Sequence, residues 1–210
     1  MTTAEYIRNH PLREFKKGQV ILQGNDASEF LYAVRSGYVK IISYNNSGDA
    51  RFLWVTGRYD VIPSEYLFLP TKPLDYFYIA LTDVSAYEIK KTEFIAETKT
   101  NAALMKDTAI AMSTHYDDLL MRIGTMEESS VRMRLLSTLC QLAERFSTSD
   151  PVDFYELGLV LTHQDLADMT NSTRETATIE LQKLRDEGYI DYSRNKLTVH
   201  LLACRNALEI

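Results

Sequence analysis

Two charged residues beside a short turn are the residues of this sequence best placed to recognise another molecule. Arg174 and Glu175 follow Thr173, a favourable N-cap residue, so both are expected in the first turn of a helix. In the major groove of DNA, arginine can donate two hydrogen bonds to guanine, and glutamate can accept one from cytosine. These residues, with Thr178 on the same exposed face, predict a helix whose first turns read DNA bases.

A first helix and a short turn must position this face. Thr162 has an acidic residue three positions later, the spacing of a capping box, so the first helix is expected at His163–Met169. Thr170–Ser172 is the expected turn. The second helix is expected to run to about Glu187 and to end at Gly188, because glycine is favoured just after a helix.

The rest of this segment supplies a core and a wing. Three apolar residues of the second helix recur at helical spacing and are expected to be buried: Ala177, Leu181 and Leu184. Two strands are expected at Tyr189–Tyr192 and Leu197–His200, on either side of 193–196. The whole pattern predicts a winged helix-turn-helix, and a helical hairpin with ordinary surface charges is the alternative.

Contacts to the DNA backbone are expected from residues around these helices. Helix N-termini offer amide donors to phosphate, and polar side chains bind phosphate as well. The expected residues are Thr162, His163, Gln164, Ser172, Thr173, Arg194 and Lys196. Because the C-terminal part of this acidic chain is itself rich in aspartate and glutamate, few lysines and arginines are expected to reach phosphate, so the affinity should depend only weakly on salt.

A heptad of apolar residues upstream predicts a dimer. Alternating steps of four and three residues, as in a coiled coil, connect Met105, Ala109, Met112, Tyr116, Leu119, Ile123 and Met126. Because this stripe is narrow, pairing with a second copy is favoured over a helix packed only on its own domain, which remains the alternative. Gly124–Ser129 is the expected hinge before a further helix at Ser130–Phe146.

The first hundred residues are expected to form β-structure. Short apolar runs alternate with glycine and polar turns, which is typical of an antiparallel sandwich or barrel. Strands are expected at Val20–Leu22, Phe30–Val34, Val39–Tyr44, Phe52–Val55, Tyr76–Leu81 and Val84–Ile89. Thr2–Asn9 is expected to be a short helix, and the strand pattern stops near Thr92.

Nearly the whole chain resembles the CRP/FNR superfamily of bacterial regulators. The resemblance is strongest over LTHQDLADMTNSTRETATIELQKLRDEGYI, and weaker over KKGQVILQGNDASEFLYAVRSGYVKI and YDVIPSEYLF. It implies an α+β fold with an N-terminal antiparallel β-roll (a double-stranded β-helix) over 1–98, a long dimerisation helix over 99–126 and a winged helix-turn-helix over 127–210. It also implies a homodimer that regulates transcription at a palindromic DNA site, with RNA polymerase as a partner.

The residues that hold a cyclic nucleotide in members of this family are missing from the matching positions. The family has a Gly-Glu pair and an Arg-Ser pair there, whereas this chain has Ser64-Glu65 and Leu74-Asp75. On the dimer helix, Asp118-Leu119 replaces a threonine-serine pair. Because phosphate recognition needs a cation or several convergent donors, no binding of cyclic AMP or cyclic GMP is expected.

A different effector, or none, is therefore expected in the roll. The candidate pocket residues are Trp54, Ser64, Glu65, Tyr66, Tyr78, His115 and Asp118. Most aromatic side chains of the roll are expected to be core, because strands favour aromatics. At His115 a solvated helix histidine is favoured over a ligand. The sequence leaves open whether the protein senses a non-nucleotide small molecule or is constitutively active.

The base-reading helix departs from the family as well. Many members carry a second arginine five residues after the first, where this chain has Ile179. Isoleucine cannot donate to guanine but can contact a thymine methyl group. The half-site is therefore expected to lack the guanine that this arginine reads.

Composition and motifs disfavour other classes of protein. No apolar run approaches the roughly 20 residues that span a bilayer, and the N-terminus lacks a signal peptide, so a cytoplasmic protein without a membrane partner is expected. Cys140 is expected to pack as a small hydrophobe, and with Cys204 it forms neither a metal-binding spacing nor a disulfide framework.

An enzyme is not expected. The four histidines lie outside the strand region, so the roll lacks the ligands for a metal, and no haem or other cofactor is expected. Phosphate-binding and nucleophile motifs are also missing from the sequence. The remaining alternative of another class is a signalling or interaction module that does not bind DNA.

Overall fold

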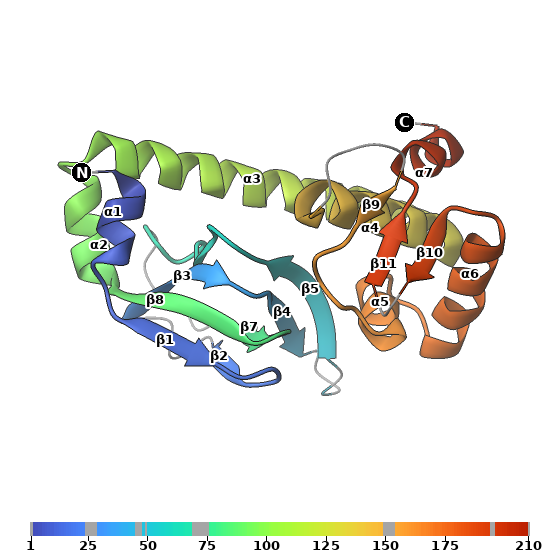
Figure 1. Cartoon of the computed structure of the whole chain (residues 1–210), viewed down its shortest axis with the longest axis horizontal. Helices are drawn as coiled ribbons and strands as arrows, with labels where there is room; N and C mark the ends of the chain where they lie inside the picture. The colour runs from blue at the N-terminus through green and yellow to red at the C-terminus, as the bar shows by residue number, and fades with distance from the viewer. Residues whose placement is uncertain are drawn as a thin grey trace. The chain divides into compact units, whose positions relative to one another are not determined.

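The structure, a computed structural model, describes residues 2–23, 29–44, 48, 50–68, 76–148, 154–193 and 196–209. The chain divides into a first unit, Met1–Asp117, and a second unit, Asp118–Ile210. The division falls inside α3 (Ala102–Glu127), a single helix of 26 residues (Figure 1). The long helix expected over 99–126 is therefore present, whereas the division into three parts at 98 and 126 stays a prediction.

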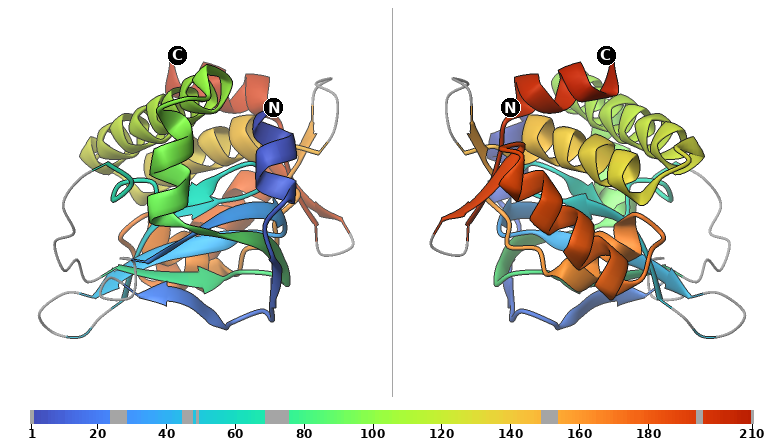
Figure 2. Two further views of the ribbon diagram at one scale, coloured as in Figure 1. Left: turned by 90° about the vertical axis from the view of Figure 1, so that its left-hand side faces the viewer. Right: turned by 90° about the vertical axis from the view of Figure 1, so that its right-hand side faces the viewer.

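Two four-stranded antiparallel sheets form the roll of the first unit (Figure 2). One sheet has the order β1-β8-β3-β6, made of Leu12–Phe15, Val84–Lys90, Phe30–Ser36 and Val61–Ile62. The other has the order β2-β7-β4-β5, made of Val20–Gln23, Tyr76–Ala80, Val39–Tyr44 and Ala50–Thr56. Every described pairing is antiparallel, as predicted for a β-roll.

Strand β3 shows how the sequence builds two cores in this unit. Successive side chains of a strand point to opposite faces of the sheet. Tyr32 and Val34 belong to a buried cluster with residues of both sheets, whereas Leu31 and Ala33 belong to a second cluster. The second cluster includes residues of α1 (Thr3–Arg8), α2 (Lys91–Thr98) and the start of α3. Helices therefore cover one face of the β3 sheet and attach α3 to the roll.

Three elements of the first unit are missing from the sequence expectations. β1 is an edge strand with the sequence LREF and mostly exposed side chains, so it lacks an apolar alternation. β6 has only two residues, too few to show an alternation of apolar and polar side chains. The sequence pattern does not distinguish α2 from the long helix that follows it. The short N-terminal helix is confirmed as α1, with Thr2 and Glu5 forming a capping box.

Helix α4 (Val131–Phe146) is the centre of the second unit. Ser130 caps it by accepting a hydrogen bond from the Met133 amide, and its buried face packs against α6 and α7. Cys140 is buried on this face, as expected. The helix-turn-helix consists of α5 (His163–Met169) and α6 (Arg174–Asp186), within one residue of the expected bounds.

A small antiparallel sheet forms the wing. Strands β10 (Ile190–Ser193) and β11 (Lys196–Val199) pair as predicted, and β11 also pairs with the unpredicted β9 (Tyr155–Glu156). The unpredicted helix α7 (Leu201–Leu208) follows β11 directly. Its N-cap, His200, makes no side-chain capping bond, which explains why the sequence carries no start signal for this helix.

Candidate nucleic-acid interface and sensor site

Hydrogen bonds at both ends of α5 fix the turn that leads into α6. At the start, the Thr162 hydroxyl accepts from the Asp165 amide (3.1 Å), and the Thr162 amide donates to the Asp165 carboxylate (3.0 Å), which completes the expected capping box. At the end, the Thr170 hydroxyl donates to the Leu166 carbonyl (2.8 Å). Asn171 then has a φ of 52°, a left-handed conformation that asparagine tolerates better than most residues.

Helix α6 buries one face and exposes another. Thr173 caps it by accepting a hydrogen bond from the Thr176 amide (3.2 Å). The predicted buried residues are confirmed: Ala177, Leu181 and Leu184. Arg174 and Glu175 are exposed, and Ile179 is 56% exposed, so two charges and one apolar side chain lie on the first turns of the helix.

Both charges of the first turn are suited to bind a partner. The pKa of the Glu175 carboxyl lies below its ordinary value because its own backbone amide, and then the Thr173 side chain, hydrogen-bond to it. Glu175 is therefore ionised at neutral pH and can only accept hydrogen bonds. The Arg174 guanidinium makes no hydrogen bond or ion pair within the described part of the chain, so its donors are available.

Thr178 is half-buried, so the expectation that it is exposed beside Arg174 is wrong. Its hydroxyl donates to the Arg174 carbonyl (2.7 Å) and lies 3.0 Å from Nδ1 of His163 on α5. Because the one hydroxyl proton goes to the carbonyl, His163 Nδ1 donates in the second bond. Both side chains therefore connect the two helices.

The residues expected to contact the DNA backbone differ in how many polar atoms remain available. The Thr162 hydroxyl donates to Asp165 (2.6 Å), and the Gln164 amide donates to Asp168 (2.7 Å). Ser172 is half-buried, with its hydroxyl in hydrogen-bonding contact with a neighbouring threonine, whereas Thr173 is exposed. The Thr173 hydroxyl contacts Thr176 Oγ1 (3.0 Å) as well as the Thr176 amide, so all four side chains would have to exchange internal partners for phosphate.

Ion pairs occupy most of the described lysines and arginines of the second unit. In the wing, Lys196 lies 2.5 Å from Glu156, and Arg194 lies outside the described residues. The other pairs are Arg132–Glu187, Arg145–Asp118, Lys183–Glu180, Arg185–Asp186 and Arg205–Glu144. Arg174 is therefore unusual in this unit as an exposed cation without an acidic partner among the described residues.

Helix α3 has a row of exposed apolar side chains. Of the seven residues predicted for the dimer seam, Met105, Ala109, Tyr116, Leu119 and Ile123 are exposed, whereas Met112 and Met126 are half-buried. Three further residues that were not predicted are also exposed: Ile110, Leu120 and Met121. The apolar face is therefore broader than the heptad, and exposed apolar surface of this extent marks an interaction site.

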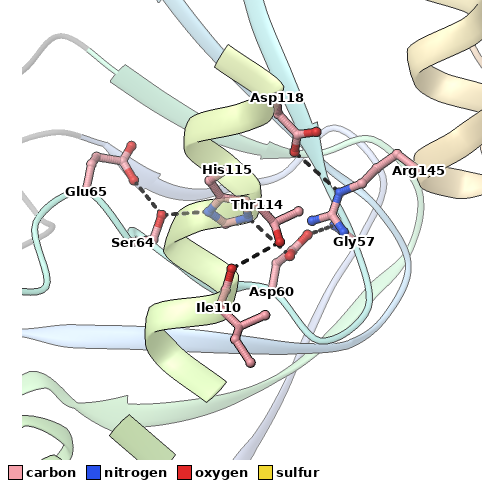
Figure 3. Close-up of polar contacts among 9 residues, drawn as sticks. All are labelled: Gly57, Asp60, Ser64, Glu65, Ile110, Thr114, His115, Asp118 and Arg145. Carbon is pink, nitrogen blue, oxygen red and sulfur yellow. Dashed lines mark hydrogen bonds and ion pairs between the residues drawn. The ribbon is translucent and has the colours of Figure 1, made fainter. Parts of the chain in front are cut away.

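A chain of hydrogen bonds connects five residues of the first unit, which we call the sensor-site chain: Asp60, His115, Ser64, Glu65 and Tyr78. Figure 3 shows the first four. The buried Asp60 contacts His115 Nε2 on α3 (3.1 Å), and His115 Nδ1 contacts the Ser64 hydroxyl (2.9 Å). Ser64 Oγ lies 3.2 Å from the Glu65 carboxylate, which also accepts a hydrogen bond from the Tyr78 hydroxyl. Residues on both sides of the short strand β6 are thereby connected to β7 and to α3.

The His115 side chain is 14% exposed, so the expectation of a solvated helix histidine is wrong. A carboxylate only accepts, so His115 Nε2 must donate to Asp60. A neutral His115 then accepts the Ser64 proton at Nδ1. A protonated His115 instead donates from Nδ1 to the Ser64 oxygen, and the Ser64 hydroxyl then donates its proton to the Glu65 carboxylate. The protonation state of one helix residue therefore sets the direction of the bonds in the loop.

The order Ser64–His115–Asp60 is that of a hydrolase triad, but the surroundings do not favour that chemistry. Acyl transfer needs hydrogen-bond donors where an oxyanion forms beside the serine. Here a Glu65 carboxylate oxygen lies 3.2 Å from the serine hydroxyl and would repel that charge. The carboxylates of Glu65 and Asp60 would also repel a phosphate group.

The other candidate pocket residues are mainly structural. Trp54, Tyr66 and Tyr78 are 5%, 4% and 0% exposed, which agrees with the expectation that most aromatics of the roll are core. Asp118 belongs to the second unit, where its carboxylate lies 3.4 Å from Arg145 Nε. Leu74 and Asp75, expected at the family's phosphate position, lie outside the described residues.

A small pocket of the first unit includes Ser64 of the sensor-site chain. Its volume is about 60 Å³, and its lining includes the apolar residues Leu67, Phe94, Leu104 and Met112. Pockets for drug-sized ligands have volumes of about 300–1,000 Å³. The pocket as it stands is large enough only for a few waters or one small apolar group.

Sequence reasoning did not single out Asp60. Its carboxylate accepts a hydrogen bond from the Gly57 amide (2.8 Å), and its amide donates to the Gly57 carbonyl (3.1 Å). Aspartate near glycine is an ordinary turn signal, so nothing in the sequence marks this residue as a partner of a histidine 55 positions later.

The described residues hold neither a helix suited to span a membrane nor a cluster suited to bind a metal. None of the described helices combines the length and the apolarity that crossing a membrane requires. Among the same residues, no group of three or more histidine, cysteine, aspartate or glutamate side chains is arranged to hold a metal ion.

Two family models match the chain and together cover both units. The model for the cyclic nucleotide-binding domain matches residues 12–101, and the model for the Crp-like helix-turn-helix domain matches residues 133–203. The chain belongs to the CRP/FNR superfamily. Among its relatives, the anaerobic regulatory protein of Bacillus subtilis (strain 168) is 29% identical over 181 residues, which are 85% of this chain and 74% of that protein.

Solved CRP/FNR-type structures have the same fold. FixK2 from Bradyrhizobium japonicum superposes with a TM-score of 0.77 at 14% identity, covering 94% of this chain and 96% of that one. A CRP/FNR-family transcriptional regulator from Thermus thermophilus superposes with a TM-score of 0.69 at 25% identity, covering 95% of this chain and 99% of that one. This CRP/FNR chain is therefore a DNA-binding transcription regulator, and its relatives are regulators rather than enzymes.

Proposed function

We propose that this regulator binds a palindromic DNA site as a homodimer, with the first turns of α6 in the major groove. The observation that supports this most strongly is the exposed pair Arg174 and Glu175 at the start of α6. The guanidinium has no partner among the described residues, and the carboxylate is held ionised. Ile179, one turn on, would contact a thymine methyl group rather than a guanine.

The support for a homodimer is the apolar face of α3. Tyr116 and Ile123 are 65% and 59% exposed, and they lie two turns apart on the predicted seam. A second copy of the helix would cover them by knobs-into-holes packing. The two recognition helices would then enter successive major grooves about 34 Å apart.

The N-terminus of α6 is the best supported backbone contact, because Thr173, Arg174 and Glu175 are exposed there. His163 and Thr178 act indirectly by holding α5 against α6. Thr162, Gln164, Ser172 and Lys196 would bind phosphate only after exchanging an internal partner. Arg194 remains a proposed contact from outside the described residues.

We further propose that cyclic nucleotides do not control this protein. Glu65 and Asp60 form the acidic part of the sensor-site chain, and both are already hydrogen-bonded to its other members. A cyclic phosphate would meet carboxylates instead of a cation. Action without a ligand, or control by a small uncharged effector, remains compatible with the narrow pocket. The proposal as a whole places the protein in the cytoplasm, with RNA polymerase as a further partner.

The primary test is selection from random duplex DNA with purified protein and no added ligand. The proposal expects a palindrome whose half-sites are about one helical turn apart, and a stoichiometry of two chains per site. Enrichment of no sequence by a folded dimer would mean either that an effector is required for DNA binding or that the rival function holds, a signalling or interaction module that does not bind DNA.

Isothermal titration calorimetry with cyclic AMP and cyclic GMP tests the effector part separately. No heat of binding is expected at concentrations where the protein binds its selected DNA. Micromolar binding of either nucleotide would overturn the claim that the acidic chain excludes a phosphate.

A further inference from the structure

The two cysteines of the chain lie against each other in the second unit. Cys140 on α4 is 4% exposed, and Cys204 on α7 is 0% exposed. The Cys204 thiol donates to the Tyr189 carbonyl (3.7 Å), and Cys140 lies close enough for the two thiols to shift each other's pKa. Because the sequence has only two cysteines, all of its thiols meet at one point although they are far apart in the chain.

An ion pair holds the two helices together beside this contact. Arg205, next to Cys204, places its guanidinium 2.5 Å from the carboxylate of Glu144, which lies one turn after Cys140 on α4. Helices α4 and α7 also pack directly on one another. A second, independent interaction therefore holds the two helices, and with them the two thiols, side by side.

We propose that Cys140 and Cys204 form a reversible intramolecular disulfide, with hydroperoxides as the oxidant. The Cys204 thiolate attacks one peroxide oxygen, which breaks the O–O bond, gives a sulfenic acid and releases water from hydrogen peroxide. The Cys140 thiolate then attacks the Cys204 sulfur, which forms the S–S bond, breaks the S–O bond and releases a second water. Two thiols lose two protons and two electrons, and the peroxide is reduced to two waters.

The interaction between the thiols favours Cys204 as the first nucleophile. Cys140 lowers the pKa of Cys204 below its ordinary value, against the opposing effect of burial. A thiolate, not a thiol, reacts with peroxide. Cys204 is therefore the cysteine that is oxidised first, and Cys140 is the one that resolves the sulfenic acid.

Access to the buried pair is provided by the position of α7. It is a helix of only eight residues, and Leu202 on its outer face is 61% exposed. Short elements with little buried surface open locally at low free-energy cost. Hydrogen peroxide is small enough to enter when α7 separates briefly from α4.

The pair lies next to the connection between the recognition helix and the wing. Tyr189 follows Gly188 at the end of α6 and precedes β10, and its carbonyl accepts both the Cys204 thiol and the His200 amide (2.8 Å). A disulfide removes the thiol proton, so this carbonyl loses one of its two donors. We expect the wing to shift and DNA affinity to change, a consequence that rests on the proposed DNA-binding function.

The disulfide itself is tested without DNA. The reduced full-length protein is treated with hydrogen peroxide, its free thiols are alkylated, and it is digested with trypsin without reduction. We expect peptides 135–145 and 197–205 to be joined, with the mass of their sum less two hydrogens, and to separate after dithiothreitol treatment. Two alkylated peptides, a link between two chains, or a sulfinic acid without a link would overturn the proposal.

The variants Cys140→Ala and Cys204→Ala give matched controls, each checked for folding by circular dichroism in the reduced state. Cys140→Ala should accumulate a sulfenic acid at position 204 that reacts with dimedone, whereas Cys204→Ala should accumulate much less. Equal labelling of both would overturn the assignment of Cys204 as first nucleophile. Should either variant unfold, counting of reactive thiols in the wild-type protein, two before and none after peroxide, decides whether the disulfide forms.

The effect on DNA is measured separately with the selected palindrome. Oxidation should change the affinity of the wild-type protein several-fold, dithiothreitol should reverse the change, and Cys140→Ala should not respond. An unchanged affinity in a protein whose disulfide is proven by mass would overturn the regulatory consequence. Failure of the reduced protein to bind any DNA would instead contradict the proposed function.

Discussion

The hydroxyl of Thr178 on α6 lies 3.0 Å from Nδ1 of His163 on α5, so the two helices of the DNA-binding motif share a polar contact as well as an apolar core. Replacing Thr178 with valine preserves the shape but removes the contact. We expect Thr178→Val to lower the free energy of unfolding by about 1 kcal/mol, measured by urea denaturation, because His163 loses its acceptor.

Thr178→Ser is the matched control, since serine keeps the hydroxyl. It should retain most of the stability and DNA affinity that Thr178→Val loses. If the two variants bind DNA equally well, Thr178 does not support the position of the recognition helix.

The ion pairs of the second unit predict how DNA affinity depends on salt. Lys183, Lys196 and Arg205 are each paired with a glutamate, so few cations are available to displace the counterions of DNA. We expect log affinity against log salt to have a slope of roughly −2 to −4, measured by fluorescence anisotropy between about 50 and 200 mM salt. A slope near about −10 would mean that these pairs break and their cations bind phosphate.

The sensor-site chain makes His115 important for the first unit. Its ring bonds both Asp60 and Ser64, so His115→Phe would leave a buried carboxylate with fewer donors. We expect a loss of about 2 kcal/mol in the free energy of unfolding at pH 7, measured by urea denaturation. Ser113→Ala, at an exposed position of the same helix, should change stability by less than about 0.5 kcal/mol. Similar values for both variants would show that the chain is not needed for stability.

Gly37 tests the close approach of two turns in the roll. Its φ is 85°, and an added Cβ would lie 2.2 Å from the Asp83 carbonyl oxygen, so alanine there meets both backbone strain and steric overlap. We expect Gly37→Ala to cost about 3 kcal/mol or more in thermal or urea unfolding. Gly18→Ala has the same φ but open space around the Cβ, and it should cost only about 1–2 kcal/mol. Equal costs would contradict the packing of Gly37 on Asp83.

Local signals account for the elements that the sequence predicted well. Thr162 and Thr173 begin α5 and α6 as capping residues, and Gly188, with a φ of 84°, follows α6. Helix caps and left-handed glycines depend on neighbouring residues only, so one sequence is enough to recognise them. β9 and α7 carry no such signal, because a two-residue strand has no period and His200 makes no side-chain cap.

Contacts between distant residues explain most of what the sequence missed at the sites. Asp60 and His115 are 55 positions apart, and each looks ordinary in its own segment. The contact between Cys140 and Cys204 depends on how α7 packs on α4, and the large separation in the chain pointed away from it. Helical geometry alone predicts an exposed Thr178, whereas its partner His163 lies on the other helix of the motif.

The central claim, that the start of α6 reads DNA, is tested most directly by comparing two arginines of this helix. Arg174 lies in its first turn without a described partner, and Arg185 lies in its last turn beside Asp186. Fluorescence anisotropy on the selected palindrome should show at least about a tenfold loss of affinity for Arg174→Ala, since a bidentate base contact contributes about 1–3 kcal/mol. Arg185→Ala should bind nearly as well as the unmodified protein. Equal affinities for both variants, or a larger loss for Arg185→Ala, would contradict the account.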